Sequence, residues 1–259
     1  MRNERDITLN VMERGSGKPL VLLHGNGESL EYFKSQIRYF SRSYRVIAVD
    51  TRGHGGSERG SAPFTLKQFA KDLKALLDTM GIRKISLLGF SDGGNIALIF
   101  ALKYPDSVER LILNGANLNP FGMKASVLIP IAFEYAAAVV KASGGIAAWK
   151  HRPDGADRKA LTAEKREAVR KKEMFGLMIR EPWIRPKHLR EISCPTLVIA
   201  GTKDMIRTSH TRLIAERIRS ARLVLLRGDH FIAAGRSRAF NRAVERFLRE
   251  SEEEYDTGD

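Results

Sequence analysis

Residues 85–94, ISLLGFSDGG, decide the fold of this chain. An apolar run leads into Gly89-Phe90-Ser91-Asp92-Gly93-Gly94, and a helical pattern begins immediately afterwards. A serine at the apex of a sharp strand-to-helix turn is the context that a G-x-S-x-G nucleophile elbow needs. The glycines fit this interpretation, since a Cβ atom at Gly89 or Gly93 would crowd the crossing backbones. The stretch therefore predicts that Ser91 is a nucleophile, and the rest of the chain must supply an oxyanion hole, a base and an acid.

The length and composition suit a globular enzyme. At 259 residues, with 43% apolar and 8% aromatic residues, the chain can form one large α/β domain, alone or with an inserted lobe. The single cysteine, Cys194, excludes an internal disulfide framework and fits a reducing compartment. We expect it to be a buried, unreactive thiol, because it opens an apolar run.

Targeting signals are not evident from the sequence. The first ten residues, MRNERDITLN, lack the apolar core of a secretory signal. The most apolar stretch, residues 127–140, contains Pro130 and Glu134, and we expect no membrane span. We therefore expect a cytoplasmic protein.

The net charge of +14 is unevenly distributed. The last ten residues, 250–259, carry six acids and no base, and we expect this acidic tail to be disordered. A strongly basic remainder fits a solvated surface, an anionic substrate or weak nonspecific nucleic-acid binding. No zinc-knuckle spacing, RNP-like aromatic run or helix-turn-helix signal supports a specific nucleic-acid partner.

Strand and helix patterns alternate along most of the chain. The runs that predict strands are 7–11, 19–23, 44–49, 85–88, 111–113, 196–200 and 223–226. Apolar residues at helical spacing lie between them, in residues 30–40, 66–80, 95–104 and 213–218, and again at 240–248. This alternation predicts a parallel sheet with helices on both faces, and ligands bind at the carboxyl ends of such strands.

The alternation breaks between residues 117 and 190, where two helical patterns, 127–140 and 162–180, follow one another. We interpret residues 117–190 as an inserted helical cap, residues 1–116 and 191–249 as the α/β core, and 250–259 as the acidic tail. The cap holds 15 Lys or Arg and 7 Asp or Glu. Its apolar side chains can line a pocket above Ser91 or pack between helices, and the sequence does not distinguish the two roles: Phe121, Met123, Phe133, Tyr135, Trp149, Met174, Phe175, Met178 and Trp183.

Two polar residues that follow later strands can serve as the acid and the base. Asp204 follows the run at 196–200, and His230 follows the run at 223–226. His230 would take the proton of the Ser91 hydroxyl and return it to the leaving group, while Asp204 would orient the imidazole. Asp229 is a rival acid, which we rank below Asp204 because adjacent side chains on an extended loop point apart.

The oxyanion hole can be built from two backbone N–H groups. Residues 24–27, HGNG, follow the run at 19–23, and their glycines let the backbone approach a substrate, so the Asn26 N–H can donate. The N–H of Asp92, at the start of the helix, would be the second donor. The Asp92 carboxylate itself is expected to interact with the helix dipole.

The remaining histidines are weaker candidates. His24 opens the HGNG stretch and His54 lies in a loop that we interpret as structural, while His151, His188 and His210 lie in polar stretches and are expected to be exposed. No pair has metal-ligand spacing with supporting Cys or carboxylates, so we expect no metal site.

Together these motifs resemble the α/β-hydrolase fold superfamily over nearly the whole chain. The matching stretches are 24–27 (HGNG), 50–57 (DTRGHGGS), 89–94 (GFSDGG), 201–204 (GTKD) and 228–230 (GDH). The resemblance implies an eight-stranded, mostly parallel sheet with a cap after the sixth strand, and the short N-terminus implies that the first strand is reduced or missing. Haloalkane dehalogenases are disfavoured, because they use Asp where this chain has Ser91.

The resemblance does not identify a substrate, since this fold hosts esterases, lactonases, C–C hydrolases and a few hormone receptors. The leading hypothesis is a serine hydrolase that cleaves a small carboxylic ester or lactone, neutral or anionic, through an acyl-enzyme and without a cofactor. One alternative is a C–C bond hydrolase of a vinylogous diketone acid. The other is a ligand-binding protein that retains the fold, although an intact Ser-Asp-His set argues against it. The oligomeric state stays open.

Overall fold

Seven strands form one sheet in the computed structural model, which describes residues 7–143 and 155–256, with the backbone alone at 155–162 and 251–256. The strands are β1 Val11–Arg14, β2 Pro19–Leu23, β3 Arg45–Val49, β4 Ile85–Phe90, β5 Val108–Asn114, β6 Thr196–Gly201 and β7 Ala221–Leu226. Their order is β1-β3-β2-β4-β5-β6-β7, and only β1 runs antiparallel to its neighbour. The predicted mostly parallel sheet is confirmed.

The described residues form seven strands, in agreement with the expectation that the first of eight strands is reduced or missing. The antiparallel β1 begins at Val11, so the strand predicted at residues 7–11 is displaced toward the C-terminus. Asn10, which precedes β1, is held by a backbone hydrogen bond, in which its carbonyl accepts from the Asp50 N–H at 3.0 Å. The two long helices of the segment interpreted as a cap, α4 and α5, follow β5.

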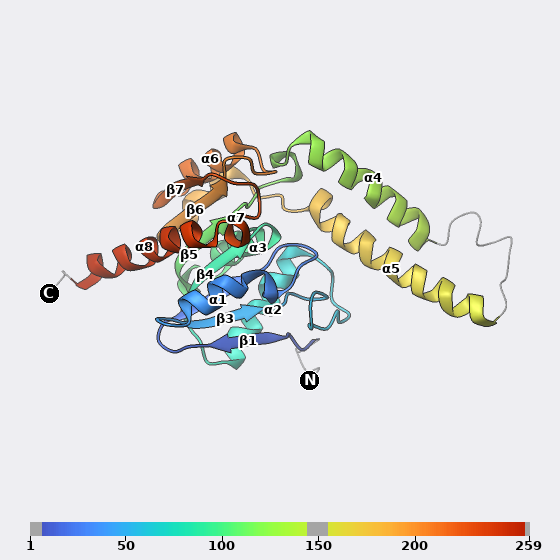
Figure 1. The fold of residues 1–259 in the computed structure, drawn as a ribbon, viewed down its shortest axis with the longest axis horizontal. Coiled ribbons are helices and arrows are strands. Elements are labelled where there is room, and N and C mark those ends of the chain that lie inside the picture. The colour runs from blue at the N-terminus through green and yellow to red at the C-terminus, as the bar shows by residue number, and fades with distance from the viewer. Residues whose placement is uncertain (1–6, 144–154, 257–259) are drawn as a thin grey trace.

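Helices cover both faces of the sheet (Figure 1). The α-helices are α1 Lys34–Phe40, α2 Leu66–Thr79, α3 Asp92–Lys103, α4 Ala125–Ala142, α5 Gly155–Arg180, α6 Thr208–Arg217, α7 Ile232–Gly235 and α8 Ser237–Asp256. Short 3-10 helices lie at Leu30–Phe33, Pro105–Ser107, Pro120–Gly122 and Pro186–Glu191.

The alternation of side chains along the strands produces two cores. In β2, Val21 and Leu23 belong to the cluster under α2, α3 and α6, while Leu20 and Leu22 belong to the cluster under α1 and α8. All four side chains are at most 1% exposed. A strand buried on both faces reads as a continuous apolar run, which is why residues 19–23 were recognisable as a strand of a parallel sheet.

The strand order places a crevice at the ends of β2 and β4. From β2 the chain continues to β3 on one side, and it then returns to β4 on the other side. In an open α/β sheet, ligands bind at the carboxyl ends of the strands where the order reverses in this way. The loops that leave β2 and β4 carry Asn26 and Ser91, so the topology brings the two predicted parts of the site together.

The cap is a pair of long helices, α4 and α5, which projects from the sheet domain (Figure 1). We call these two helices the arm. Both are longer than their patterns predicted: α4 spans Ala125–Ala142 in spite of Pro130, and α5 extends back to Gly155. They pack along one another, with Ala138 and Ala168 buried and Gly176 close to the Tyr135 ring.

The expected disorder of the acidic tail is wrong for its first seven residues. Helix α8 continues to Asp256, and Glu250 forms an ion pair with Arg222 of β7. Cys194 is half-buried, and burial raises the pKa of its thiol to about 11, as expected of an unreactive structural cysteine.

Candidate active site

The turn at Ser91 has the strained geometry that the sequence predicted. Ser91 has φ 53° and ψ −119°, and it is the one non-glycine residue with positive φ in the described part of the chain. A Cβ atom on Gly93 would lie 2.1 Å from the Leu23 carbonyl oxygen, and one on Gly89 would lie 2.2 Å from the Gly93 oxygen. Both contacts are far below van der Waals distance. Glycine is therefore required where β2, β4 and α3 cross, and the turn pushes the serine out of the sheet.

His230 and Asp204 form a buried pair beside this turn. The loop after β7 brings His230 Nδ1 within 2.6 Å of Asp204 Oδ1, which lies on the loop after β6. The same carboxylate oxygen accepts from the Ile206 N–H at 2.9 Å, which fixes its orientation. The residues are 4% and 2% exposed. A carboxylate held in this way orients the imidazole with Nε2 facing outward.

Packing contacts direct His230 toward the Ser91 turn. A Cβ atom on Gly115, which follows β5, would lie only 2.7 Å from His230 Cε1, and the Phe90 and His230 rings are 4.8 Å apart between centroids. The Ser91 N–H donates to the Asn114 carbonyl at 2.8 Å, so the serine lies at the same strand end. Buried His230 Nε2 has no hydrogen-bond partner among the described residues. Ser91 and His230 Nε2 are therefore not hydrogen-bonded to each other in this structure, and catalytic hydrogen bonds of this kind often tighten only when a substrate binds.

Asp229 points elsewhere. It is exposed, and its Oδ1 accepts from the Phe231 N–H at 2.9 Å in a local turn. This agrees with the lower rank that the sequence gave it.

The loop after β2 is fixed from several sides. The Asn26 side chain donates to the Met174 carbonyl of α5 at 2.7 Å, and its Oδ1 lies 3.3 Å from His54 Nε2. Buried His24 accepts from the Thr51 N–H through Nε2 at 3.0 Å, and burial lowers its pKa. Both histidines thus hold the loop, which agrees with their weaker standing as catalytic candidates. A rigid loop is what a preorganised oxyanion donor requires.

Two carboxyl groups lie beside the serine and a third lies on the loop after β2, and the sequence interpretation missed Glu181 and Glu28. Burial raises the pKa of Asp92 to about 6, and its Oδ2 has no partner among the described residues. Burial likewise raises the pKa of Glu181, which accepts from the Leu66 N–H at 2.8 Å. Both line a small cavity with Ser91. Glu28, on the loop after β2, has its pKa raised to about 7 by burial. Sequence spacing marks neither Glu28 nor Glu181, because only the folded cap and loop bury them.

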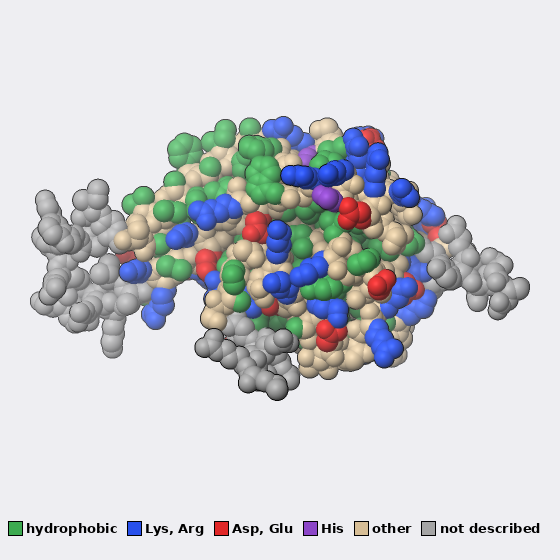
Figure 2. All heavy atoms as spheres, turned by 180° about the vertical axis from the view of Figure 1, so that it is seen from behind, with side chains coloured by type: hydrophobic (Ala, Val, Ile, Leu, Met, Phe, Trp, Pro, Cys, Tyr) green, Lys and Arg blue, Asp and Glu red, His purple; other side chains and the backbone are tan. Residues whose placement is uncertain are grey.

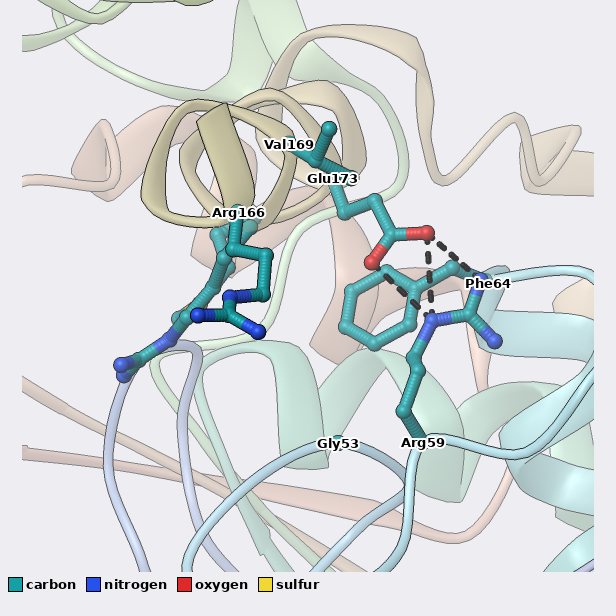
Figure 3. A pocket seen from close by; sticks show the side chains of 8 residues that line it. Gly53, Arg59, Phe64, Arg166, Val169 and Glu173 are labelled. Atoms are coloured by element: carbon teal, nitrogen blue, oxygen red, sulfur yellow. Dashed lines mark hydrogen bonds and ion pairs between the residues drawn. The ribbon is translucent and has the colours of Figure 1, made fainter. Parts of the chain in front are cut away.

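A larger cavity of about 230 Å³ separates the arm from the loop after β3. Figure 3 shows Gly53 on the loop below, the Phe64 ring beside the Arg59–Glu173 pair, and Arg166 extending from α5 above. Arg59 closes one side through an ion pair with Glu173, with 2.5 Å between Nη2 and Oε1. Met174, whose carbonyl holds Asn26, also lines it, so this cavity adjoins the loop after β2.

The other candidates have structural roles. His210 was expected to be exposed, but it is half-buried and accepts from the Leu118 N–H at 2.9 Å, because Gly122 leaves room for its ring. His188 lies 2.7 Å from Glu191, and His151 lies outside the described residues. Among the side chains that the structure describes, in residues 7–143 and 163–250, no three His, Cys, Asp or Glu are grouped to hold a metal ion.

The family profile described as alpha/beta hydrolase fold matches residues 18–139, the segment from β2 through the nucleophile turn into α4. The chain belongs to the α/β-hydrolase fold superfamily. It is an enzyme of this hydrolase class, which sets aside the binding-protein alternative.

Three similar proteins cover nearly the whole chain. The 3-oxoadipate enol-lactonase 2 of Acinetobacter baylyi is 28% identical over 95% of this chain and 94% of its own length. The 2-hydroxy-6-oxo-2,4-heptadienoate hydrolase of Pseudomonas putida is 27% identical over 93% of each. The crystal structure of the enol-lactonase from Burkholderia xenovorans LB400 superposes with a TM-score of 0.73 at 26% identity, covering 94% of this chain and 97% of that one. These identities show the superfamily and leave the specific reaction open.

Proposed function

We propose that this protein is a serine hydrolase that cleaves a small carboxylic ester or lactone through an acyl-enzyme. Ser91 is the nucleophile, His230 the general base and acid, and Asp204 the orienting acid. The observation that carries the proposal is the buried His230–Asp204 pair, 2.6 Å apart, beside a serine held at φ 53°. No cofactor is needed for this chemistry.

The first half of the reaction transfers the acyl group to the enzyme. His230 Nε2 removes the proton as Ser91 Oγ attacks the carbonyl carbon, and the carbonyl π electrons move to oxygen. The backbone N–H groups of Asn26 and Asp92 donate to this oxyanion. When the tetrahedral intermediate collapses, the C–O bond of the alcohol breaks and the imidazolium protonates the leaving oxygen.

The second half releases the acid. His230 takes a proton from water, which attacks the acyl carbon, and the ester bond to Ser91 breaks as its oxygen regains a proton. Asp204 stays ionised throughout and stabilises the imidazolium that forms twice in each turnover. In a lactone the leaving oxygen stays attached to the acyl chain, so one product carries both groups.

The substrate class is supported by the enol-lactonases that resemble this chain over its whole length. We propose a small molecule that enters beneath the arm and a cytoplasmic site of action, which the single half-buried cysteine fits. The second candidate is C–C bond hydrolysis of a vinylogous diketone acid, favoured by the similarity to the heptadienoate hydrolase of Pseudomonas putida.

We further propose that the acyl group bound next to Ser91 is uncharged. Asp92 and Glu181 line the cavity beside the serine, and with a pKa of about 6 the first is mostly ionised at neutral pH. A carboxylate on the acyl side would therefore be repelled. A negative group fits better at the distal end, under Arg166 of the larger cavity. Comparing p-nitrophenyl butyrate with the half-ester of succinate tests this: the neutral ester should have the higher kcat/KM, and Asp92→Asn should reduce the difference.

Replacing the nucleophile tests the function. Ser91→Ala should lower hydrolysis of p-nitrophenyl butyrate by about 10³-fold or more and abolish labelling by a fluorophosphonate probe. Ser209→Ala, on the exposed face of α6, is the matched control and should retain both properties. Full activity in Ser91→Ala would refute the proposal. A substrate panel of esters, lactones and vinylogous diketone acids then separates the two candidate reactions, since each predicts the higher kcat/KM on its own class.

A further inference from the structure

The outer face of α4 is apolar and exposed. Ile129, Phe133, Ala136 and Val140 follow one another at spacings of four, three and four residues, which places them on one side of the helix. Ile129 is 55% exposed, Phe133 74% and Val140 59%. Burying such side chains is normally worth roughly 1.5–3 kcal/mol each, so a face of this composition is expected to be covered. Nothing among the described residues covers it.

The opposite face of α4 is already used. Ala138 is buried, the Tyr135 ring lies against Gly176 of α5, and the Arg180 guanidinium lies 5.0 Å from the centre of that ring. The two helices therefore pack on each other through small residues and one cation–π contact. Among the residues that the structure describes, no element packs on the outer face.

The length and hydropathy of α4 approach those of a membrane helix. It has 18 residues with a mean hydropathy of 1.5, and 6% of them are buried, so it is long and apolar enough to cross a membrane by length and composition. This corrects the expectation that no segment would reach that threshold. A crossing would have to take α5 along, because the two are packed together, and α5 carries many charges. A position along the surface of a membrane avoids that cost.

The described part of α5, which packs against the inner face of α4, carries more basic than acidic side chains. Lys165, Lys171 and Lys172 are exposed on the described part of α5, while Arg166 and Arg170, also exposed, line the larger cavity toward the loop after β3. Three glutamates share this segment, of which Glu173 is paired with Arg59 and Glu167 lies 3.9 Å from Arg170. Figure 2 shows hydrophobic side chains along the upper edge of the arm and Lys and Arg side chains below them. The arm thus combines an apolar edge with a basic flank.

Two aromatic side chains extend the apolar surface toward the sheet domain. Phe121 precedes α4 and Trp183 follows α5, and their rings meet edge to face with 6.0 Å between centroids. They are 65% and 66% exposed. Aromatic rings of this kind are typical of the interface between lipid headgroups and acyl chains.

We propose that the arm docks on the surface of an anionic phospholipid bilayer, with the outer face of α4 inserted among the headgroups and acyl ends. An interfacial helix lies about 5–10 Å deep, which leaves α5 above it, where its basic side chains reach the lipid phosphates. The membrane neutralises the positive charge of the arm. A second copy of the chain would instead bring two arms of like charge together, so the charges favour the bilayer.

Vesicle co-sedimentation of the full chain tests this. Binding to vesicles of phosphatidylcholine and phosphatidylglycerol in equal parts should exceed binding to pure phosphatidylcholine by about tenfold or more, since each basic residue near an anionic surface contributes roughly fivefold. Phe133→Glu should weaken binding to the mixed vesicles by about tenfold or more. Lys171→Glu combined with Lys172→Glu should weaken binding to the mixed vesicles and leave binding to pure phosphatidylcholine unchanged.

A matched control and a lipid-free measurement complete the test. Met12→Glu makes the same kind of change at an exposed apolar side chain on β1, away from the arm, and should bind as the unmodified chain does. Unchanged hydrolysis of p-nitrophenyl butyrate by the Phe133→Glu variant would show that its core is folded. Two results would overturn the proposal: no binding of the unmodified chain to the mixed vesicles, or a dimer in sedimentation equilibrium without lipid that Phe133→Glu dissociates.

Discussion

The nucleophile turn and the arm use apolar sequence in opposite ways. At the turn, the crossing of β2, β4 and α3 leaves so little room that a Cβ atom on Gly93 would lie 2.1 Å from a carbonyl oxygen. On the arm, Phe133 is 74% exposed, although the helix around it is as apolar as a core helix. Apolar composition therefore does not determine burial. What determines burial is whether the neighbouring elements converge on the segment or leave it free.

The difference between these regions predicts that replacing a glycine by alanine destabilises the turn and stabilises the arm. Gly93→Ala places a methyl group on the Leu23 carbonyl, and neither backbone can move without breaking the sheet, so we expect a loss above about 4 kcal/mol and little folded protein. Gly176→Ala on α5 places its Cβ 3.4 Å from the Tyr135 ring, an ordinary contact, and removes the helix cost of glycine. The arm should gain roughly 0.5–1 kcal/mol.

Soluble yield and urea unfolding measure both variants. The Gly176 variant should unfold at an equal or higher urea concentration than the unmodified chain, which also shows that the method detects small gains. A folded Gly93→Ala enzyme with normal activity would break the comparison, because it would mean that the turn can expand as freely as the arm.

The second prediction concerns chemistry at the strand ends. Asp204→Asn should lower kcat for p-nitrophenyl butyrate by about 10³–10⁴-fold, because an amide stabilises the wrong imidazole tautomer and no longer balances the imidazolium. Asp229→Asn, one residue from His230 but exposed, should leave kcat unchanged. Steady-state kinetics on both variants decides between the two acids. Equal losses in both variants would remove Asp204 from its proposed role.

Most of the proposed site could be predicted from the sequence because its parts are local. Ser91 follows from a strand, a glycine turn and a helix that are contiguous, and Asp204 and His230 each follow a recognisable apolar run. The arrangement around them depends on long-range packing. Glu181 belongs to the cap, and burial that raises its pKa arises only when the cap meets the core. Half-buried His210 was missed for the same reason: its partner, the Leu118 N–H, lies 92 residues away.

The sequence pattern also could not predict which apolar side chains of residues 117–190 are buried and which are exposed. Nine apolar side chains could line a pocket or pack between helices, and the structure places Met123 and Met178 beside Ser91 but leaves Phe121, Phe133 and Trp183 exposed. Trp149 lies outside the described residues. Helical periodicity cannot separate these outcomes, because the seam between α4 and α5 and the outer face of α4 are both apolar.

The third prediction is a pH dependence that belongs to the turn. The pKa of Asp92 rises from 3.8 to about 6 in the folded chain because of burial, so the folded state binds more protons than the unfolded state between these values. Stability must therefore fall as pH rises through this window, by up to about 3 kcal/mol in total. Asp92→Asn cannot titrate and should escape that loss.

Urea unfolding between about pH 4 and 7 measures the effect. The variant's stability, relative to that of the unmodified chain, should increase steadily as pH rises and level off above the folded pKa. Two curves that stay parallel over this range would show that Asp92 titrates alike in both states, and that the turn does not hold a destabilised carboxylate.

The smallest expected effect lies where the arm contacts the sheet domain. Arg59, on the loop after β3, contacts Glu173 of α5 through Nε and Nη2 at 2.5–3.1 Å, but the side chains are 36% and 26% exposed. Partly exposed ion pairs are worth about 0.2–1 kcal/mol, and salt weakens them further. A double-mutant cycle with Arg59→Gln and Glu173→Gln should give a coupling energy in that range at low salt and a smaller one at high salt. A coupling energy above about 2 kcal/mol would mean that this pair contributes as much as a buried ion pair and holds the arm firmly to the core. A small coupling would leave the joint compliant, which lets the arm adjust to a bilayer while the turn at Ser91 stays fixed.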